Sequence, residues 1–272
     1  MNRIKIFPIY YKKDIIFRTN MYEPILAGAN NANWELDMLK DNTGDHISDK
    51  NPYYGELTAW YWVWKNYLPK HHKLEYVGFC HYRRFLDLKH PPLTERNQSF
   101  LKKISSEKFA RKILFEKLLF QFPTKKVYSS IKNSDIILTE PWVINETIYQ
   151  HYIANHPQKD IDFLIDIIRL DYPDYVDDMN YFLYNKKGYF CLNFIMKTDL
   201  FCDFMTWVFD ILNKLEMRSD FSQYSDYNTI RTPAFLIERF FNVWLIHQIK
   251  LKNLNIQEQD SYFLTPEFKK TN

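Results

Sequence analysis

Residues 75–85 read EYVGFCHYRRF, and this stretch sets the expected fold. After Glu75, residues 76–80 form a short apolar run, which is typical of a buried β-strand. The next four residues, His81 to Arg84, are polar and basic, so the predicted strand ends in charged side chains. In open α/β sheets, ligands bind beyond the carboxyl ends of the strands. In an α/β fold, the stretch therefore predicts a binding site directly after this strand.

Short apolar segments and amphipathic segments alternate along the rest of the chain. Further strands are predicted at residues 4–10, 135–138 and 189–196. Helices are predicted from Pro52 through the aromatic stretch that follows it, and at residues 101–120, 146–156, 160–170, 199–218 and 234–250. This alternation favours an α/β fold whose mostly parallel central sheet is flanked by helices. Because no repeat, low-complexity segment or linker interrupts residues 1–272, we expect a single domain.

The composition excludes several classes of protein. The net charge of the 272-residue chain is +3 and its basic residues are dispersed, so no nucleic-acid partner is expected. The richest basic stretch, residues 102–126, indicates the solvated face of a helix, with peripheral contact to anionic lipid headgroups as the alternative. The three cysteines lack disulfide or zinc spacing, the N-terminus lacks a signal peptide, and no run of eighteen apolar residues occurs. These features predict a cytoplasmic protein, with the inner face of the membrane as its alternative location.

Two arginines and a histidine give the deciding stretch its chemistry. Guanidinium groups bind phosphate oxygens in a bidentate way, and a departing nucleoside diphosphate needs its growing negative charge stabilised. Along an extended chain, Arg83 and Arg84 point to opposite sides. We expect His81, Arg83 and Arg84 to contact the diphosphate of a nucleotide-sugar donor. The alternative is that both arginines pair with carboxylates of this chain.

The same strand end bears on metal use. Many enzymes hold a metal there with an Asp-x-Asp motif, whereas this chain carries HYRR. An Asp-x-Asp string does occur at Asp160-Ile161-Asp162, but it opens a predicted helix, where the dipole favours acidic residues and carboxylates two apart do not share a face. We therefore expect catalysis without a metal or other cofactor. Entry of Asp41 or Asp45 from an earlier loop is the alternative.

A polar loop precedes the aromatic helix. Within it, Asp41, Asn42 and Asp45 surround Gly44. Such a loop suits binding of a ribose or a sugar, and its alternative is a turn followed by a helix cap.

A carboxylate near the start of the last predicted helix is the first candidate for the general base. An inverting transferase needs such a group within hydrogen-bond reach of the attacking hydroxyl. Glu238 ranks first, and its alternative is a structural pair with Arg239. Asp160 and His156 are the other candidates for the base.

Six blocks of the chain resemble, in their order and spacing, a bacterial family long classed as a domain of unknown function and found in capsule, O-antigen and exopolysaccharide gene sets. The resemblance runs nearly from end to end. The blocks are DNTGDHISDKNPYYGELTAWYWVWKN, EYVGFCHYRRFLDL, SDIILTEP, HYIANHPQKDID, YFCLNFIMKTDLF and RTPAFLIERFFNVWL.

The resemblance implies a glycosyltransferase of the A-type fold with a Rossmann-like half. It places nucleotide binding in residues 1–90 and the donor sugar and acceptor in residues 91–272. Some members of the family resemble galactofuranosyltransferases. The implied reaction is inverting transfer of a hexosyl unit, with galactofuranosyl from UDP-galactofuranose favoured, onto a glycan or a lipid-linked acceptor in surface polysaccharide synthesis.

The same resemblance extends the set of expected donor contacts. Tyr10 and Lys12 stand where the family often has a threonine-histidine-lysine run. This position implies contacts to the nucleotide base of the donor. Asn193 lies in the block that resembles the strand lining the donor sugar, and Arg231 opens the last block. Two other classes stay open beside the transferase: a nucleotide-sugar hydrolase or phosphotransferase, and an inactive scaffold of a polysaccharide assembly complex.

Overall fold

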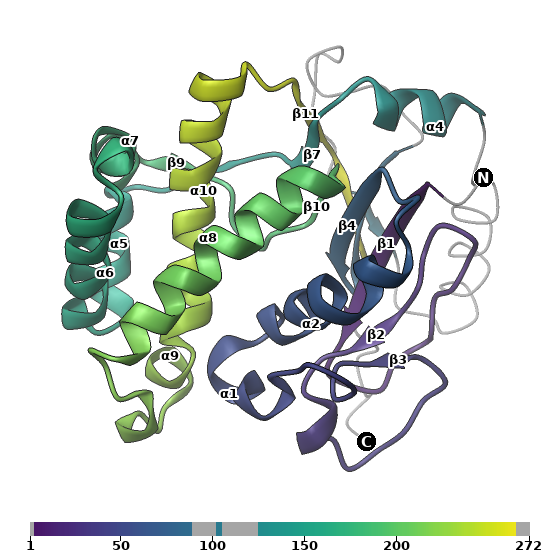
Figure 1. The fold of residues 1–272 in the computed structure, drawn as a ribbon, viewed down its shortest axis with the longest axis horizontal. Coiled ribbons are helices and arrows are strands. Elements are labelled where there is room, and N and C mark those ends of the chain that lie inside the picture. Colours follow the sequence, from purple (N-terminus) through teal and green to yellow (C-terminus); the bar gives the residue numbers. More distant parts are fainter. Residues whose placement is uncertain (1–2, 89–101, 105–124, 265–272) are drawn as a thin grey trace.

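A seven-stranded sheet forms the centre of the computed structural model, which describes residues 3–88, 102–104 and 125–264 (Figure 1). The strand order is β11-β7-β10-β4-β1-β2-β3. The strands are β1 (Ile4–Tyr10), β2 (Ile25–Leu26), β3 (Leu39–Lys40), β4 (Tyr76–His81), β7 (Ile136–Thr139), β10 (Phe194–Lys197) and β11 (Ile256–Gln259). The predicted α/β fold with a mostly parallel central sheet is confirmed.

Strand β10 runs against the direction of its neighbours. It pairs antiparallel with both β4 and β7, whereas the other pairs of this sheet are parallel. The start of β10 therefore lies at the edge where β1 and β4 end. The predicted strand over residues 189–196 is wrong in its first half, because residues 189–193 are a loop in which Cys191 has a φ of 50°.

Side chains alternate across the sheet and build two cores. Phe7 and Phe79 face the larger core, and Ile6 and Ile195 face the smaller one. Helices α8 (Thr198–Glu216) and α10 (Thr232–Lys252) cover the larger face in Figure 1. The outer helices are α5 (Ile148–Asn155), α6 (Gln158–Asp171) and α7 (Val176–Leu183). Helix α4 (Lys125–Lys132) covers the smaller face. Aromatic rings fill much of the larger core, which accounts for most of the high aromatic content.

The aromatic stretch after Pro52 is helical, as predicted, but it is divided. Helix α1 (Asn51–Tyr54) ends at Gly55, α2 (Leu57–Trp62) follows, and a π-helical turn (Val63–Tyr67) continues it. Gly55 has a φ of 54°, which a residue with a side chain rarely adopts. The break turns Glu56 toward the carboxyl edge of the sheet, where the cavity described below lies.

A second, three-stranded sheet joins distant segments. Strand β12 (Ser261–Leu264) pairs antiparallel with β5 (Arg84–Leu86) and parallel with β6 (Lys102–Ile104). The helix predicted at residues 101–120 is therefore wrong at residues 102–104, and the rest of it lies outside the described residues, as does most of the basic stretch 102–126. A two-stranded ribbon of β8 (Trp142–Val143) and β9 (Lys187–Gly188) lies beside the outer helices.

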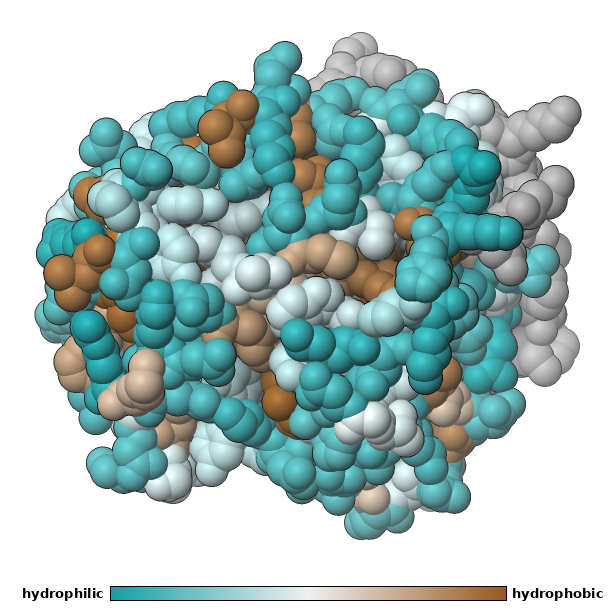
Figure 2. All heavy atoms as spheres, in the orientation of Figure 1, coloured by the Kyte–Doolittle hydropathy of each residue, from teal (hydrophilic) through white to brown (hydrophobic). Residues whose placement is uncertain are grey.

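The described part of the chain contains no helix that is both long and apolar enough to cross a bilayer. Figure 2 shows a mostly hydrophilic face with scattered hydrophobic side chains.

The contact between β4 and β10 leaves no room for a side chain at Gly78. A Cβ atom there would lie 2.7 Å from Cγ1 of Ile195 and 2.8 Å from the carbonyl oxygen of Phe194. We expect Gly78→Ala to lower the free energy of unfolding by about 1–3 kcal/mol, the usual cost of overpacking. Urea unfolding measures this as a lower midpoint with an unchanged slope. A midpoint equal to that of the wild type would contradict the close packing of these two strands.

Candidate active site

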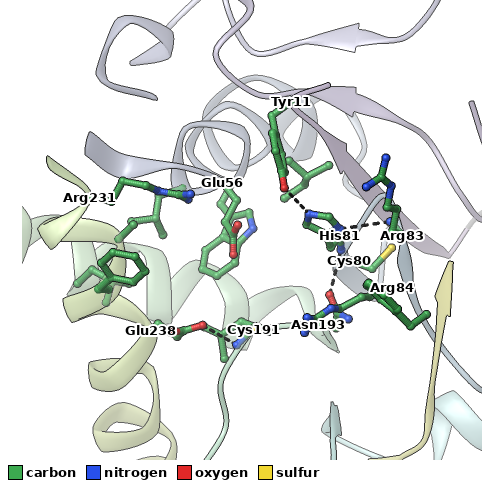
Figure 3. Close-up of a pocket in the computed structure, with 18 of the residues that line it drawn as sticks. Tyr11, Glu56, Cys80, His81, Arg83, Arg84, Cys191, Asn193, Arg231 and Glu238 are labelled. Atoms are coloured by element: carbon green, nitrogen blue, oxygen red, sulfur yellow. Dashed lines mark hydrogen bonds between the residues drawn. The ribbon is translucent and has the colours of Figure 1, made fainter. Parts of the chain in front are cut away.

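A cavity of about 400 Å³ opens at the carboxyl edge of the main sheet (Figure 3). Its walls come from the ends of β1 and β4, the start of α2, the loop before β10, and the first turns of α10. The polar side chains lining it are Tyr11, Glu56, His81, Arg83, Arg84, Cys191, Asn193, Tyr227, Arg231 and Glu238. The cavity thus lies where the HYRR stretch predicts a binding site.

Three guanidinium groups border the cavity. Arg84 lies beside Asn193 in Figure 3, and its guanidinium carbon is 5.3 Å from the centre of the Phe263 ring. Arg231 approaches from the start of α10, where its Nη1 donates a hydrogen bond of 2.8 Å to the hydroxyl of Tyr227. Arg83 instead donates through Nε to a carboxylate oxygen of Asp14 at 2.8 Å. Of the two arginines in HYRR, Arg83 therefore pairs with a carboxylate of this chain, which was the alternative to phosphate contact.

His81 is held in its neutral form. Its Nδ1 accepts the backbone N–H of Arg83 at 3.3 Å, and its Nε2 lies 3.0 Å from the hydroxyl of Tyr11. Burial and the charges of Arg84, Arg83 and Arg231 lower the pKa of His81 to about 4. Among the described residues that line this cavity, the fixed positive charges at neutral pH are therefore those of the three arginines.

Glu56 faces the cavity close to these cations. Burial raises the pKa of its carboxyl to about 7, and the negative charge of Glu238 adds to this shift. The charges of Arg231 and Arg84 oppose it. A carboxyl with such a pKa both accepts and releases protons near neutral pH, which suits acid–base chemistry. Glu56 was missed in the sequence because it resembles an ordinary acidic residue near a helix start.

Gly55 allows the guanidinium group of Arg231 to approach Glu56. A Cβ atom at position 55 would lie 2.5 Å from Nη2 of Arg231. The missing side chain therefore leaves the space that the guanidinium group occupies beside Glu56.

Glu238 lies inside the cavity, as its assignment as the base requires. Its carboxylate accepts the backbone N–H of Cys191, and burial raises its pKa. The neighbouring guanidinium of Arg239 is 3.9 Å away, and its Nη2 lies 3.2 Å from Nδ1 of His151. The loose Glu238–Arg239 contact does not occupy the carboxylate, so Glu238 stays available to a ligand.

Cys191 connects the loop before β10 to helix α10. Its positive φ turns its N–H toward Glu238, and the backbone N–H of Tyr189 donates to Oδ1 of Asn242 at 2.7 Å. The side-chain amide of Asn242 in turn donates to the carbonyl oxygen of Tyr189 at 3.0 Å. Burial raises the pKa of the Cys191 thiol to about 11, so the thiol stays protonated. These bonds fix the carboxylate of Glu238 relative to the sheet.

Two residues predicted to contact the nucleotide base, Tyr10 and Lys12, do not line the cavity. The side chain of Tyr10 is buried, where its hydroxyl donates to the carbonyl of Ile15 and accepts the N–H of Phe17. The Nζ of Lys12 lies 5.7 Å from the ring centre of Tyr11. Tyr11 itself lines the cavity, because alternation along the chain turns it away from the side to which Tyr10 points.

The predicted polar loop is held together by its own carboxylates. The buried side chain of Asp41 accepts the N–H groups of Gly28 and Ala29 and the hydroxyl of Ser48. Asn42 donates to Asn30, and Asp45 accepts from the hydroxyl of Tyr61. None of the three predicted residues lines the cavity.

The two alternative bases also lie outside the cavity lining. Asp160 is buried at the start of α6, where it accepts hydrogen bonds from the hydroxyls of Ser219 and Tyr224. The ring of His156 packs against that of Phe235, with 4.4 Å between their centres, and its Nδ1 lies 2.7 Å from the carbonyl oxygen of Asn228. In the described ranges, no cluster of three or more His, Cys, Asp or Glu residues is arranged to hold a metal ion.

Comparisons with known proteins agree with this fold. The model of the family described as "Domain of unknown function (DUF4422)" matches residues 5–249. The apo structure of the WbbM bifunctional glycosyltransferase superposes with a TM-score of 0.82 at 28% sequence identity. The superposition covers 97% of this chain and 46% of that chain, so this chain spans about half the length of the solved protein. No curated protein matches the chain.

The raised pKa of Glu56 predicts a pH-dependent stability. A folded-state pKa of about 7 against an ordinary value of 4.5 means that the folded protein holds this proton more tightly than the unfolded chain. The resulting stabilisation is complete below pH 4.5 and is lost as the pH rises through 7. From pH 5 to pH 8, we expect the free energy of unfolding of Glu56→Gln to rise by about 2–3 kcal/mol relative to wild type. Denaturant unfolding of both proteins at the two pH values measures this, and parallel curves would refute the shift.

Proposed function

We propose that this chain, which belongs to the DUF4422 family, is a glycosyltransferase that takes a hexosyl unit from a nucleotide-sugar donor. One observation carries the proposal: guanidinium groups and two carboxylates with raised pKa values converge on one cavity at the carboxyl edge of an α/β sheet. The guanidinium groups suit a diphosphate and a carboxylate suits an acceptor hydroxyl, so one cavity offers both functions. The likeness to the WbbM structure supports the same class of enzyme.

In the proposed reaction, the diphosphate lies against Arg84 and Arg231. An acceptor hydroxyl attacks the anomeric carbon of the donor and gives its proton to Glu238. The bond between the anomeric carbon and the β-phosphate oxygen breaks, and its electron pair leaves with the nucleoside diphosphate. Two fixed guanidinium groups stabilise that charge where it develops. Attack from the face opposite the leaving group inverts the anomeric configuration.

The positions of the two carboxylates favour Glu238 as the base. Glu56 also borders a smaller hollow of about 150 Å³ formed by Tyr11, Ala27 and Asn51, beyond the ends of β1 and β2. We assign the nucleoside to that side, since the first strands of a Rossmann-like sheet bind nucleotides. Glu238 does not line that hollow and accepts the N–H of Cys191, so we assign it to the acceptor.

The finer assignments rest on the sequence resemblance. They are UDP-galactofuranose as donor, a glycan or lipid-linked acceptor, and a role in surface polysaccharide synthesis. Catalysis without a divalent metal is proposed from the residues of the site. The arginines support the last point, because they supply positive charge where a metal would otherwise be needed. We place the reaction in the cytoplasm, consistent with three free cysteines. Most of the basic stretch that would contact lipid lies outside the described residues.

Removal of either arginine assigned to the diphosphate is expected to weaken UDP binding. Loss of a charge-assisted hydrogen bond costs about 1.5–3 kcal/mol, so Arg84→Ala and Arg231→Ala each raise the Kd of UDP by about 10- to 100-fold. Calorimetry in excess EDTA measures this and tests metal independence at the same time.

Arg169→Ala is the matched control, because its exposed guanidinium lies on α6, away from the cavity. Thermal melting of each variant separates a binding defect from misfolding. Unchanged UDP affinity in both cavity variants, or UDP binding that needs added manganese, would count against the assignment.

A screen of UDP-sugars with synthetic glycan acceptors, read by mass spectrometry, tests the activity itself. We expect transfer from UDP-galactofuranose that survives EDTA. Glu238→Gln should lower turnover by ~10²–10⁴-fold while UDP affinity stays unchanged, because only proton removal is lost. Asp160→Asn serves as a comparison that lies outside the cavity.

Three outcomes would redirect the proposal. Near-full turnover of Glu238→Gln would remove it as the base. Release of free sugar without an acceptor would identify a hydrolase, and absence of nucleotide-sugar binding would favour a scaffold.

A further inference from the structure

A second hollow, of about 250 Å³, adjoins the cavity. The two share Arg84, Cys191, Asn193 and Phe263 as a common wall. Beyond that wall, the second hollow is lined by residues that follow β7 and by the segment between β11 and β12. A ligand in the second hollow therefore lies directly beside the cavity.

Asn193 presents an unused hydrogen-bond donor at the shared wall. Its side chain is 1% exposed, and its Oδ1 accepts the backbone N–H of His81 at 3.0 Å. Because only the oxygen of the amide accepts a hydrogen bond, this contact fixes the orientation of the amide. Nδ2 is buried and has no hydrogen-bond partner among the described residues. A buried donor without a partner costs about 1–3 kcal/mol, which a ligand oxygen at this wall would recover.

The two hollows differ in charge. The cavity combines three arginines with the carboxylates of Glu56 and Glu238, whereas Glu140 and Asp260 contribute carboxylates to the second hollow. Of the described residues that line the second hollow, Arg84 is the sole cation, and it belongs to the shared wall. Among the described lining residues, the second hollow therefore offers an anionic ligand fewer cations than the cavity does, which favours a neutral ligand there.

An exposed tryptophan forms one side of the second hollow. Trp142 is 47% exposed, and its ring centre lies 5.9 Å from that of Phe190. Pairing of β8 with β9 holds its backbone in place. The face of an indole ring is electron-rich and attracts the weakly positive C–H groups on one face of a pyranose ring. Together with polar groups around it, such a ring is suited to a sugar.

We propose that this second hollow binds the acceptor sugar as a neutral hexopyranosyl residue stacked on Trp142. The inference rests on the proposed transferase function and deepens it. Cys191 lines both hollows and donates its N–H to Glu238, so the base stands at their boundary. A hydroxyl of the stacked sugar thereby points at Glu238 and at the donor sugar. At the wall between the two hollows, Nδ2 of Asn193 donates to an oxygen of the donor sugar or of the acceptor sugar.

Saturation-transfer NMR on the intact chain tests the site without turnover. The probes are the methyl pyranosides of glucose, galactose and mannose, each with and without saturating UDP. We expect saturation transfer to at least one of these sugars, persisting with UDP bound, because the two ligands occupy separate hollows. Trp142→Ala should abolish it, and Tyr181→Ala, which removes a more exposed aromatic ring from α7, should not. Asn193→Asp keeps the acceptor for His81 and removes the donor, so it should weaken the signal.

Several results would overturn the inference. They are no saturation transfer to any of the three sugars, a signal that Trp142→Ala leaves unchanged, or displacement of the sugar by UDP.

The transfer assay distinguishes failure of the site from failure of the function. Once an acceptor is found, Trp142→Ala should raise the KM for acceptor about tenfold, the effect of losing one aromatic stacking contact, and leave the KM for donor unchanged. An unchanged acceptor KM in an active enzyme rejects the site and keeps the function. Absence of both UDP binding and transfer in the wild type rejects the function, while sugar binding at Trp142 is judged by NMR alone.

Discussion

The antiparallel insertion of β10 between β4 and β7 is the constraint on which the candidate site depends. It brings the segment before β10 to the edge where β1 and β4 end, and there Asn193 accepts the N–H of His81. With a parallel β10, Cys191 and Asn193 would lie at the opposite edge of the sheet, and Glu238 would lose its backbone donor. The direction of one short strand therefore joins the HYRR segment to helix α10 in a single cavity.

Charge within the cavity is nearly balanced, and the balance explains the unusual titration of its groups. Three guanidinium groups lie near two carboxylates, and Asp14 holds one of the three. The arginines lower the pKa of His81, whereas burial raises the pKa values of Glu56 and Glu238 despite those cations. An incoming diphosphate would raise the latter two further, since like charges disfavour ionisation. Donor binding and proton affinity at this site are thus coupled.

The sequence was most informative where one physical signal dominated. Buried strands 4–10 and 75–80 and the helices after Pro157 and Lys197 follow from apolar periodicity, and the cavity follows from charge placed after a buried strand. Glu56 could not be found this way, because its raised pKa arises from burial beside residues far away in sequence. The opposite error occurred in the polar loop. Asp41 resembles a ligand-binding carboxylate in the sequence, but in the structure it accepts backbone N–H groups of Gly28 and Ala29. Strand direction at β10 leaves no local trace in the sequence.

Helix α10 fixes the relative positions of Arg231 and Glu238, the two residues assigned to the diphosphate and to the acceptor hydroxyl. Arg231 immediately precedes the first residue of the helix and Glu238 lies seven residues further on, which spans about 10 Å along the axis at the usual helical rise. In the proposed reaction the leaving phosphate and the attacking hydroxyl lie on opposite sides of the anomeric carbon, and the helix fixes the backbone positions of the arginine that binds the first and the carboxylate that activates the second. Loss or gain of one residue in this segment would shorten or lengthen the helix between Arg231 and Glu238 and turn the carboxylate by about 100° about the helix axis. Length variation should therefore be tolerated in the surface loops and not in this turn of helix.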